Sequence, residues 1–416
     1  MLKKSSKKRY YKKLYKYKTN FLQVNNTLKK IKCFFSRVFN KLPKKVIKSF
    51  IILTCSFLFV IIFINREKLS PDYISAFFED IIVQNQHGAG YPYKINGNKV
   101  MSQNFKNINN NAFVISDTTF VSLNASAKEM NKKQHCYQTP MIKVNDNREI
   151  IYDLGGKHAE IMSKSKSLHT VELENNIISA AVSNNGIYAI ATESNGFLGQ
   201  LTVFSKDGKD IYYKYNFADH YITDIALSDN GKSAAVCGCS AQEGSLVSTV
   251  YVFDYKNEVP KLKLDYKDNM FIRIEYLSNG NIVAVGDRLL SVINVNNGEK
   301  KDYDYENKTL ITFDINKKEG ILLALSLSED GNNTHMILIN KSGKVENIIN
   351  TENTIKSVSY KSGKIAALSY ENLYIYNSFG KNLKTIAAGN DARKVNLSSG
   401  RTAYILGITE IRRVKC

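Results

Sequence analysis

One phrase recurs along the C-terminal three quarters of this chain: an apolar stretch, a polar turn with glycine, and a second apolar stretch. Its clearest copy is "ITDIALSDNGKSAAV" at residues 222–236. An alternating pattern on both sides of a glycine turn predicts a β-hairpin, because glycine accepts the positive φ that tight turns require. The turn glycines of the six clear copies are Gly186, Gly231, Gly280, Gly320, Gly363 and Gly400, at intervals of 45, 49, 40, 43 and 37 residues.

A second phrase follows most copies, for example "LTVFSKDGK" (201–209) and "MILINKSGK" (336–344). Each is an apolar strand that runs into a turn, and a further short strand comes next. Four antiparallel strands in a period of about 43 residues are typical of a β-propeller blade. A helical repeat disagrees with the period-two alternation, and a β-sandwich does not repeat one four-strand phrase at a fixed period.

Two weaker copies, at residues 98–130 and 140–162, bring the predicted count to eight blades. Seven blades are the alternative, because the copy at 98–130 is the least regular. The last copy ends one strand short after "ITEIRRVKC", and "YPYKI" (91–95) is left over at the other end. We therefore predict an all-β, eight-bladed propeller over residues 91–416 that residues 91–95 close, so that no sheet edge stays open.

The charge of the chain is concentrated at its N-terminus. Residues 1–48 contain 17 Lys and Arg and no Asp or Glu, whereas the rest contains 41 basic and 38 acidic residues. Residues 1–45 are predicted to be a cytoplasmic tail whose basic amphipathic helix, 21–42, lies on an anionic inner leaflet. Tyrosines among the lysines of residues 1–20 are compatible with nucleic acid, but the apolar segment that follows favours the membrane, so no nucleic-acid partner is expected.

That apolar segment is "SFIILTCSFLFVIIFI", residues 49–64, which holds 12 Phe, Ile, Leu or Val and no charge. It predicts a transmembrane signal anchor over residues 46–65, since about 20 apolar residues cross a bilayer. A buried globular helix and a cleavable signal peptide are the alternatives; the 48 preceding residues are too long for a signal peptide's basic region. The residues taken as representative of the span are Ser49, Phe50, Leu53, Phe57, Val60 and Ile64.

The charge bias places the N-terminus in the cytoplasm by the positive-inside rule and residues 91–416 outside the plasma membrane. Residues 66–90 are predicted to form a juxtamembrane helix and a linker, with Ser70 as N-cap and Pro71 at the first helical position.

No motif for catalysis, a cofactor or a metal stands out. The six histidines are scattered, and no nucleophile elbow, phosphate loop or dinucleotide fingerprint occurs. Tryptophan is absent, which disfavours the tryptophan-docked blades of quinoprotein dehydrogenases. Cys237 and Cys239 share one strand face and are expected to be small packed residues. Cys136 and Cys416 can be either a disulfide or two free thiols, because connectivity is not encoded in a sequence pattern.

Polar segments between the second and third strands of blades three, four and six predict a recognition face. They are "TESNGFLGQ" (192–200), "GCSAQEGSLVS" (238–248) and "LSEDGNNTH" (327–335), and we expect them to be long loops on one side of the ring. Tolerated surface insertions are the alternative. The candidate recognition residues are Glu193, Asn195, Phe197, Gln242, Glu243, Leu246, Asp330, Asn332 and His335.

The stretches "YDLGGK" (152–157), "VYVFD" (250–254) and "AYILGITEIR" (403–412) carry a resemblance. With them, the chain resembles a domain-of-unknown-function family of membrane-anchored proteins from clostridia-like Gram-positive bacteria, over about residues 46–416. The resemblance implies a propeller-like ectodomain outside the plasma membrane and no established activity. The long basic tail and the Cys-Gly-Cys stretch depart from the family's pattern.

We therefore expect a binding or assembly platform, with no catalysis, for an envelope protein or a glycan. The alternative is a glycan hydrolase or lyase that uses carboxylates in the funnel of the propeller. Signalling by recruitment to the basic tail is a third hypothesis. The carboxylates that lie near first strands are Asp219, Asp224, Glu275 and Asp314; each is expected to be a turn residue or to point outward from its strand.

Overall fold

The computed structural model describes residues 48–50, 52–57, 59, 71–327 and 333–416 of the chain. The chain divides into two units, Met1–Ile74 and Ser75–Cys416. The described residues between 48 and 59 are helical and exposed, and they include Ser49, Phe50, Leu53 and Phe57. No helix within the described ranges is both long and apolar enough to cross a membrane. Val60, Ile64 and the predicted helix 21–42 lie outside those ranges.

Helix α3 (Pro71–Gln84) confirms the helix that was predicted before the propeller. It begins at Pro71, since the fixed φ of proline suits the first helical turn and its missing N–H would have no partner there. A single 3-10 turn, η2 (Ser102–Asn104), precedes the first blade.

Eight four-stranded antiparallel sheets follow, which confirms the predicted eight-bladed propeller. Blades one to four contain β2 (Phe105–Ile108), β3 (Asn111–Ile115), β4 (Thr119–Leu123), β5 (Glu129–Gln134); β6 (Pro140–Val144), β7 (Glu149–Asp153), β8 (His158–Met162), β9 (Ser167–Glu172); β10 (Ile177–Val182), β11 (Tyr188–Ser194), β12 (Phe197–Phe204), β13 (Ile211–Phe217); β14 (Tyr221–Leu227), β15 (Ala234–Gln242), β16 (Ser245–Phe253) and β17 (Leu262–Lys267).

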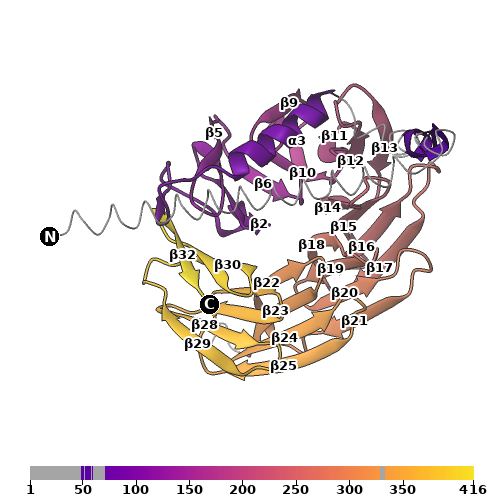
Figure 1. Ribbon diagram of the computed structural model, residues 1–416. Coiled ribbons are helices and arrows are strands. Elements are labelled where there is room, and N and C mark those ends of the chain that lie inside the picture. The colour runs from indigo at the N-terminus through magenta and orange to yellow at the C-terminus, as the bar shows by residue number, and fades with distance from the viewer. Residues whose placement is uncertain (1–47, 51, 58, 60–70, 328–332) are drawn as a thin grey trace. The chain divides into compact units, whose positions relative to one another are not determined.

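Blades five to eight complete the ring (Figure 1). They contain β18 (Phe271–Tyr276), β19 (Ile282–Gly286), β20 (Leu289–Ile293), β21 (Lys300–Asp304); β22 (Thr309–Asn316), β23 (Gly320–Ser326), β24 (Thr334–Asn340), β25 (Val345–Thr351); β26 (Ser357–Lys361), β27 (Lys364–Leu368), β28 (Asn372–Asn377), β29 (Asn382–Ala387); β30 (Lys394–Ser399), β31 (Thr402–Leu406), β32 (Glu410–Lys415) and β1 (Tyr93–Lys94).

Blade eight is closed by the strand predicted for it. Its order is β1-β32-β31-β30, so the N-terminal β1 pairs with the C-terminal β32. Tyr93 lies opposite Ile411 and Lys94 lies opposite Glu410. The N–H of Ile95 continues the pairing by donating to Thr409 O at 2.8 Å. Residues from both ends of the propeller sequence thus share one sheet, as the leftover "YPYKI" predicted.

The apolar core is divided among eight clusters, one between each pair of neighbouring blades. Phe113 of blade one packs with Ile151 and Met162 of blade two. The ring-closing cluster joins Phe105 of blade one to Tyr404 of blade eight. The second and third strands of each blade have few exposed side chains, because neighbouring blades cover both faces of each sheet. Burial of this apolar area stabilises the closed ring as a whole.

Two predictions about segment boundaries were wrong. The blade expected at 98–130 spans Phe105–Gln134, and the segments 192–200 and 238–248 are not long loops. Strands β15 and β16 pair out to Gln242 and Ser245 and leave only Glu243 and Gly244 in the turn, both with positive φ. The end of this hairpin extends beyond the neighbouring blades, so water surrounds both of its faces. Its side chains are therefore polar, and the sequence resembles that of a loop.

Candidate functional site

The eight blades define two faces of the ring. Strands within a blade alternate in direction, so the turns between second and third strands lie on the same side as the connections between blades. We call this side the 2–3 face. The turns between first and second strands and between third and fourth strands lie on the other side, which we call the 1–2 face. Sequence prediction placed the recognition residues on the 2–3 face.

The described recognition candidates do lie on that side. Glu193 and Asn195 are exposed at the β11–β12 turn, and Phe197 begins β12. Gln242, Glu243 and Leu246 surround the β15–β16 turn, and all three are exposed. His335 is half-buried near the start of β24. Asp330 and Asn332 lie outside the described residues.

The 2–3 face differs from the 1–2 face in its number of exposed apolar side chains. Fifteen large hydrophobic residues of the described propeller are exposed, and nine of these are on the 2–3 face, whereas two are on the 1–2 face and four on outer strands. Seven of the eight blades contribute. The nine residues are Leu154, Phe197, Tyr221, Leu246, Met270, Ile272, Leu327, Tyr370 and Ile408. Exposed apolar side chains gathered on one side of a protein are typical of an interaction surface.

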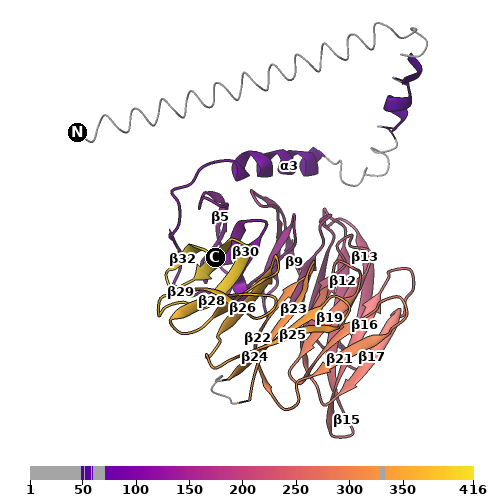
Figure 2. The ribbon, with the colours of Figure 1, turned by 60° about the horizontal axis from the view of Figure 1, so that its bottom comes forward.

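Helix α3 contacts the opposite, 1–2 face. Asp80 accepts hydrogen bonds from Ser165 N at 2.9 Å and from Ser165 Oγ at 2.6 Å, in the β8–β9 turn. Lys166 Nζ lies 3.1 Å from Glu79. Asn124, in the β4–β5 turn, donates to Gln84 O at 3.1 Å. Figure 2 shows α3 at one side of the blades and the end of β15 at the other, so α3 leaves the 2–3 face uncovered.

The innermost strands place charged side chains at the axis of the ring. These strands are the first of each blade, and together they carry five basic and three acidic residues: Lys106, Lys143, Arg273, Lys361 and Lys394, with Asp224, Glu275 and Asp314. Their neighbours along each strand pack into the cores between blades, so the alternation of a strand directs these side chains toward the axis.

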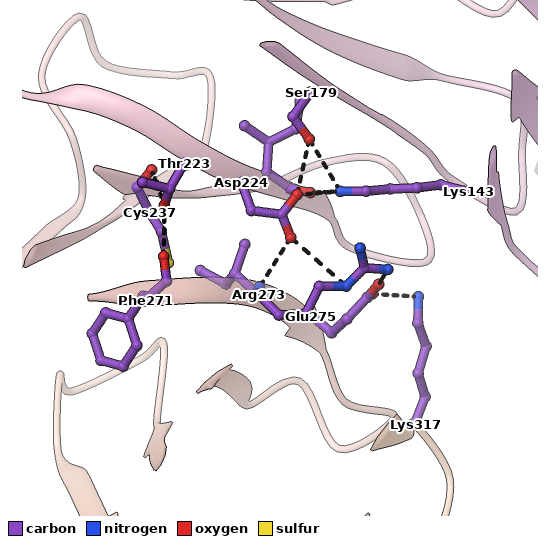
Figure 3. A network of polar contacts seen from close by, with 11 residues as sticks. Lys143, Ser179, Thr223, Asp224, Cys237, Phe271, Arg273, Glu275 and Lys317 are labelled. Atoms are coloured by element: carbon purple, nitrogen blue, oxygen red, sulfur yellow. Dashed lines mark hydrogen bonds and ion pairs between the residues drawn. The ribbon is translucent and has the colours of Figure 1, made fainter. Parts of the chain in front are cut away.

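Asp224 of β14 is the centre of this network (Figure 3). Its Oδ1 lies 2.5 Å from Lys143 Nζ and accepts from Ser179 Oγ at 2.8 Å. Its Oδ2 accepts from Ile274 N at 3.1 Å and lies 3.7 Å from Arg273 Nε. One carboxylate thus joins the innermost strands of blades two, three, four and five.

Glu275 extends the network along β18. Arg273 Nη2 lies 3.2 Å from Glu275 Oε1, and Lys317 Nζ lies 3.2 Å from Glu275 Oε2. Burial alone would raise the pKa of Glu275, but the charges of Lys317, Arg273 and Lys143 outweigh it and lower the pKa to about 2. Glu275 is therefore ionised at neutral pH, and a carboxylate in that state does not supply the proton that a general acid gives to a glycoside.

Three of the four carboxylates considered for glycan chemistry are placed differently from the prediction. Asp219 is exposed in the connection before β14, as a turn residue was expected to be. Asp224, Glu275 and Asp314 point inward, which corrects the outward or turn positions expected for them. Asp314 accepts from Ser359 Oγ at 3.0 Å and from Tyr360 N at 2.8 Å. The first strand faces the polar axis on one side, so a charge there does not imply solvent outside the ring.

Three lysines at the axis have no carboxylate within ion-pair distance among the described residues. They are Lys106 of β2, Lys361 of β26 and Lys394 of β30. Burial lowers the pKa of Lys106 to about 7, with Arg273 and Lys394 acting in the same direction. Lys318 and Asp146, from blades six and two, meet across the ring on its 1–2 side at 3.3 Å.

A separate pocket of about 350 Å³ lies at the outer strands of blades one and two. His135, Cys136 and His158 are among its lining residues. Glu160, also there, is paired with Lys133 at 2.6 Å. Within residues 71–327 and 333–416 no group of three or more His, Cys, Asp or Glu is arranged to hold a metal ion. The described cysteines Cys55, Cys136, Cys237, Cys239 and Cys416 are all free thiols.

Sequence reasoning missed Lys143 and Arg273. Both occupy an inward position in the first strand of a repeat, for example in "FIRIEY" (271–276). Charged residues that alternate with apolar ones in the first strand of several repeats are the signal that was available.

Several solved structures are similar to this chain in architecture and distant from it in sequence. The C-terminal WD40 domain of Sif2 has a TM-score of 0.56 at 10% identity and covers 79% of this chain and 99% of its own. A eukaryotic initiation factor has a TM-score of 0.52 at 10% identity, over 79% of this chain and 89% of its own. BamB from Moraxella catarrhalis has a TM-score of 0.48 at 10% identity, over 77% and 100%. At such identity the first two show the fold alone, and no curated protein sequence matches the chain.

Fold and site therefore define a β-propeller protein with eight blades, a charged axis and apolar side chains concentrated on one face. The family model of DUF5711, a family of unknown function, matches residues 88–415. The chain belongs to this family, which confirms that it is a member of a domain-of-unknown-function family.

Proposed function

We propose that this protein is a single-pass membrane protein whose propeller lies outside the cytoplasm and binds a protein of the cell envelope through its 2–3 face. The observation that carries the proposal is the set of nine exposed large hydrophobic side chains on that face. In this role the protein is a platform for binding or assembly, and the strands of the propeller position the strand ends and turns that carry the contact residues.

The membrane attachment is supported by the sequence of residues 46–65 and by the charge before it. Twelve large apolar residues in an uncharged run of 16 favour insertion into a bilayer. The excess of 17 basic residues over none on the N-terminal side favours a cytoplasmic tail. The propeller would then be outside, and the basic tail would lie near anionic lipids of the inner leaflet.

The composition of the 2–3 face favours a protein partner over a glycan. Phe197, Tyr221, Tyr370 and Met270 are of the types enriched in protein interfaces, where buried aromatic residues dominate the binding free energy. Leucine and isoleucine side chains complete the set, and they contribute no hydrogen bonds to sugar hydroxyls. A carbohydrate site would instead be expected to pair each aromatic ring with polar side chains in a pocket.

The test is cross-linking in intact cells followed by capture of the full-length protein. We expect one envelope protein to be enriched by the parent chain and reduced at least tenfold by the double substitution Phe197→Asp and Leu246→Asp. The matched control is Ile348→Asp, on outer strand β25, where the side chain is 51% exposed. This control should leave capture unchanged.

The outcomes separate the candidate functions. If the double substitution captures the same protein as the parent does, or if Ile348→Asp removes it equally, the 2–3 face is not the binding surface. Captured material that is glycan, not protein, would support the glycan partner instead. A far-ultraviolet circular dichroism spectrum equal to that of the parent shows that each variant is folded.

A further inference from the structure

The 1–2 face differs from the 2–3 face in charge as well as in apolar content. The turns of the 1–2 face contain fifteen Lys and Arg and eight Asp and Glu, a net charge of +7. The turns and connections of the 2–3 face, leaving out residues 328–332, contain six basic and ten acidic residues, a net charge of −4. The near-neutral propeller is therefore polarised, with its positive side on the face that α3 contacts. Helix α3 adds Asp72, Glu79 and Asp80 and no basic residue, so the 1–2 face together with α3 has a net charge of +4.

Helix α3 presents apolar side chains away from the propeller on this positive side. Phe78, Ile81 and Ile82 are 58%, 41% and 61% exposed. Their spacing places them on one side of the helix, opposite Asp80, which is buried against Ser165. A helix whose one side is fixed to a basic surface and whose other side is apolar has the properties of a helix that lies in a membrane interface.

Two turns of the 1–2 face repeat this combination of apolar tip and lysine. Phe379 is 87% exposed in the β28–β29 turn and is followed closely by Lys381. Val259 is 68% exposed in the β16–β17 turn, next to Pro260 and Lys261. These are the two exposed large hydrophobic residues on this face. Each can enter the headgroup layer while the neighbouring lysine meets lipid phosphates.

We propose that the 1–2 face, with the exposed side of α3, is a binding surface for an anionic lipid membrane. The positive charge of the 1–2 face favours an anionic membrane as its partner, because a negative lipid surface attracts this face and repels the acidic 2–3 face. The chain before α3 also leads toward the apolar segment 46–65. The inference does not depend on the partner of the 2–3 face, and the two can fail separately.

The experiment uses the fragment 71–416, which contains all eight blades, the closing strand and α3, and lacks the segment 46–65. Because every interface between blades is internal to it, we expect this fragment to fold on its own, and a far-ultraviolet circular dichroism spectrum typical of β-sheet checks this first. It is sedimented with vesicles of phosphatidylcholine alone or mixed equally with phosphatidylglycerol. We expect binding to the anionic vesicles only, and loss of binding at high salt.

Charge reversal on the two faces provides a matched comparison. Lys209→Glu with Lys256→Glu alters exposed lysines of the 1–2 face, whereas Lys157→Glu with Arg288→Glu alters exposed residues of the 2–3 face by the same net charge. The first pair should weaken vesicle binding by more than tenfold, since each lysine near an anionic surface contributes about fivefold. The second pair should change it little. Phe379→Ser should also reduce binding.

Three results would overturn the inference. The parent fragment could fail to sediment with anionic vesicles, or both pairs of charge reversals could weaken binding equally, which would mean that net charge alone acts. The fragment could also self-associate without lipid in analytical ultracentrifugation and lose this with Phe379→Ser, which would identify a second copy as the occupant of the face.

Discussion

Lys143 and Asp224 form an ion pair of 2.5 Å at the axis of the ring, although they belong to blades two and four. Their side chains are only 9% and 7% exposed. Burial lowers the pKa of Lys143, while the carboxylate of Asp224 acts to raise it. Lys143 also donates to Ile225 O at 2.8 Å, so this lysine and its partner connect blades that do not share an apolar interface.

The first prediction concerns this pair. Asp224→Ala should lower the free energy of unfolding by about 3–5 kcal/mol, because it leaves the ammonium group of Lys143 buried without its partner. The double substitution Lys143→Met with Asp224→Ala should be less destabilising than Asp224→Ala alone. Chemical denaturation of fragment 71–416 measures both. Equal destabilisation by the single and double substitutions would contradict a coupled pair.

The second prediction concerns Glu149, which is fully buried at the start of β7 near α3. Among the described residues, no other residue donates a hydrogen bond to either of its carboxylate oxygens. Burial, with a smaller contribution from Asp80, raises its pKa from 4.5 to about 8. The folded state therefore holds a proton that the unfolded state releases, and stability should fall as the pH rises from about 4.5 to 8 and then level off.

Glu149→Gln should remove this part of the pH dependence and stabilise the propeller at pH 8, by at most about 5 kcal/mol. Unfolding midpoints measured from pH 5 to pH 9 test it. Glu174→Gln, in an exposed connection on the other face, is the control and should keep the slope of the parent. A parallel pH profile for Glu149→Gln and the parent would disprove the assignment.

The third prediction concerns the closing strand. Lys94 and Glu410 are direct partners in the β1–β32 pairing, so Lys94→Cys with Glu410→Cys should form a disulfide that joins the two ends of the propeller. A bond that closes so long a loop can stabilise by up to about 5 kcal/mol. Thermal unfolding should show a higher midpoint under oxidising conditions than after reduction. Lys94→Cys alone, as the control, should show no such difference. No difference for the double substitution would contradict the pairing of β1 with β32.

The fourth prediction concerns the side of the membrane. Cys136 is a free, exposed thiol in the connection between blades one and two. A maleimide that does not cross membranes should label it in intact cells, and Cys136→Ser should remove that label. Labelling of Cys136 that requires permeabilised cells would place the propeller in the cytoplasm and refute the proposed topology.

The repeat made most of the fold predictable. Turn glycines such as Gly186, Gly231 and Gly280 recur because the turn between the first and second strands of these blades has a residue with positive φ, so the glycines indicate the repeating hairpin. The closing strand was predictable by elimination, since blade eight lacked one strand. The extended β15–β16 hairpin was not, because Ser240 and Gln242 pair through their backbones while their side chains meet water, and a polar sequence then resembles a loop.

The candidate site was predictable only in part. The sequence predicted that Phe197 and Leu246 share one face, and the structure has both on the 2–3 face, because strand order decides which turns share a side. It did not reveal that Tyr221, Met270 and other exposed apolar residues accompany them, since an exposed and a buried hydrophobic residue look alike in a sequence. The inward position of Asp224 also depends on contacts between blades far apart in the chain, to Lys143 and Arg273.

The central claim is that the propeller uses its two faces for different partners, a protein on the 2–3 face and lipid on the 1–2 face. A photo-cross-linking amino acid placed at Leu246 or at Phe379 of the full-length protein in living cells tests it directly. We predict cross-links from position 246 to a protein and from position 379 to phospholipid. Cross-links to lipid from position 246, or to one and the same protein from both positions, would contradict the account.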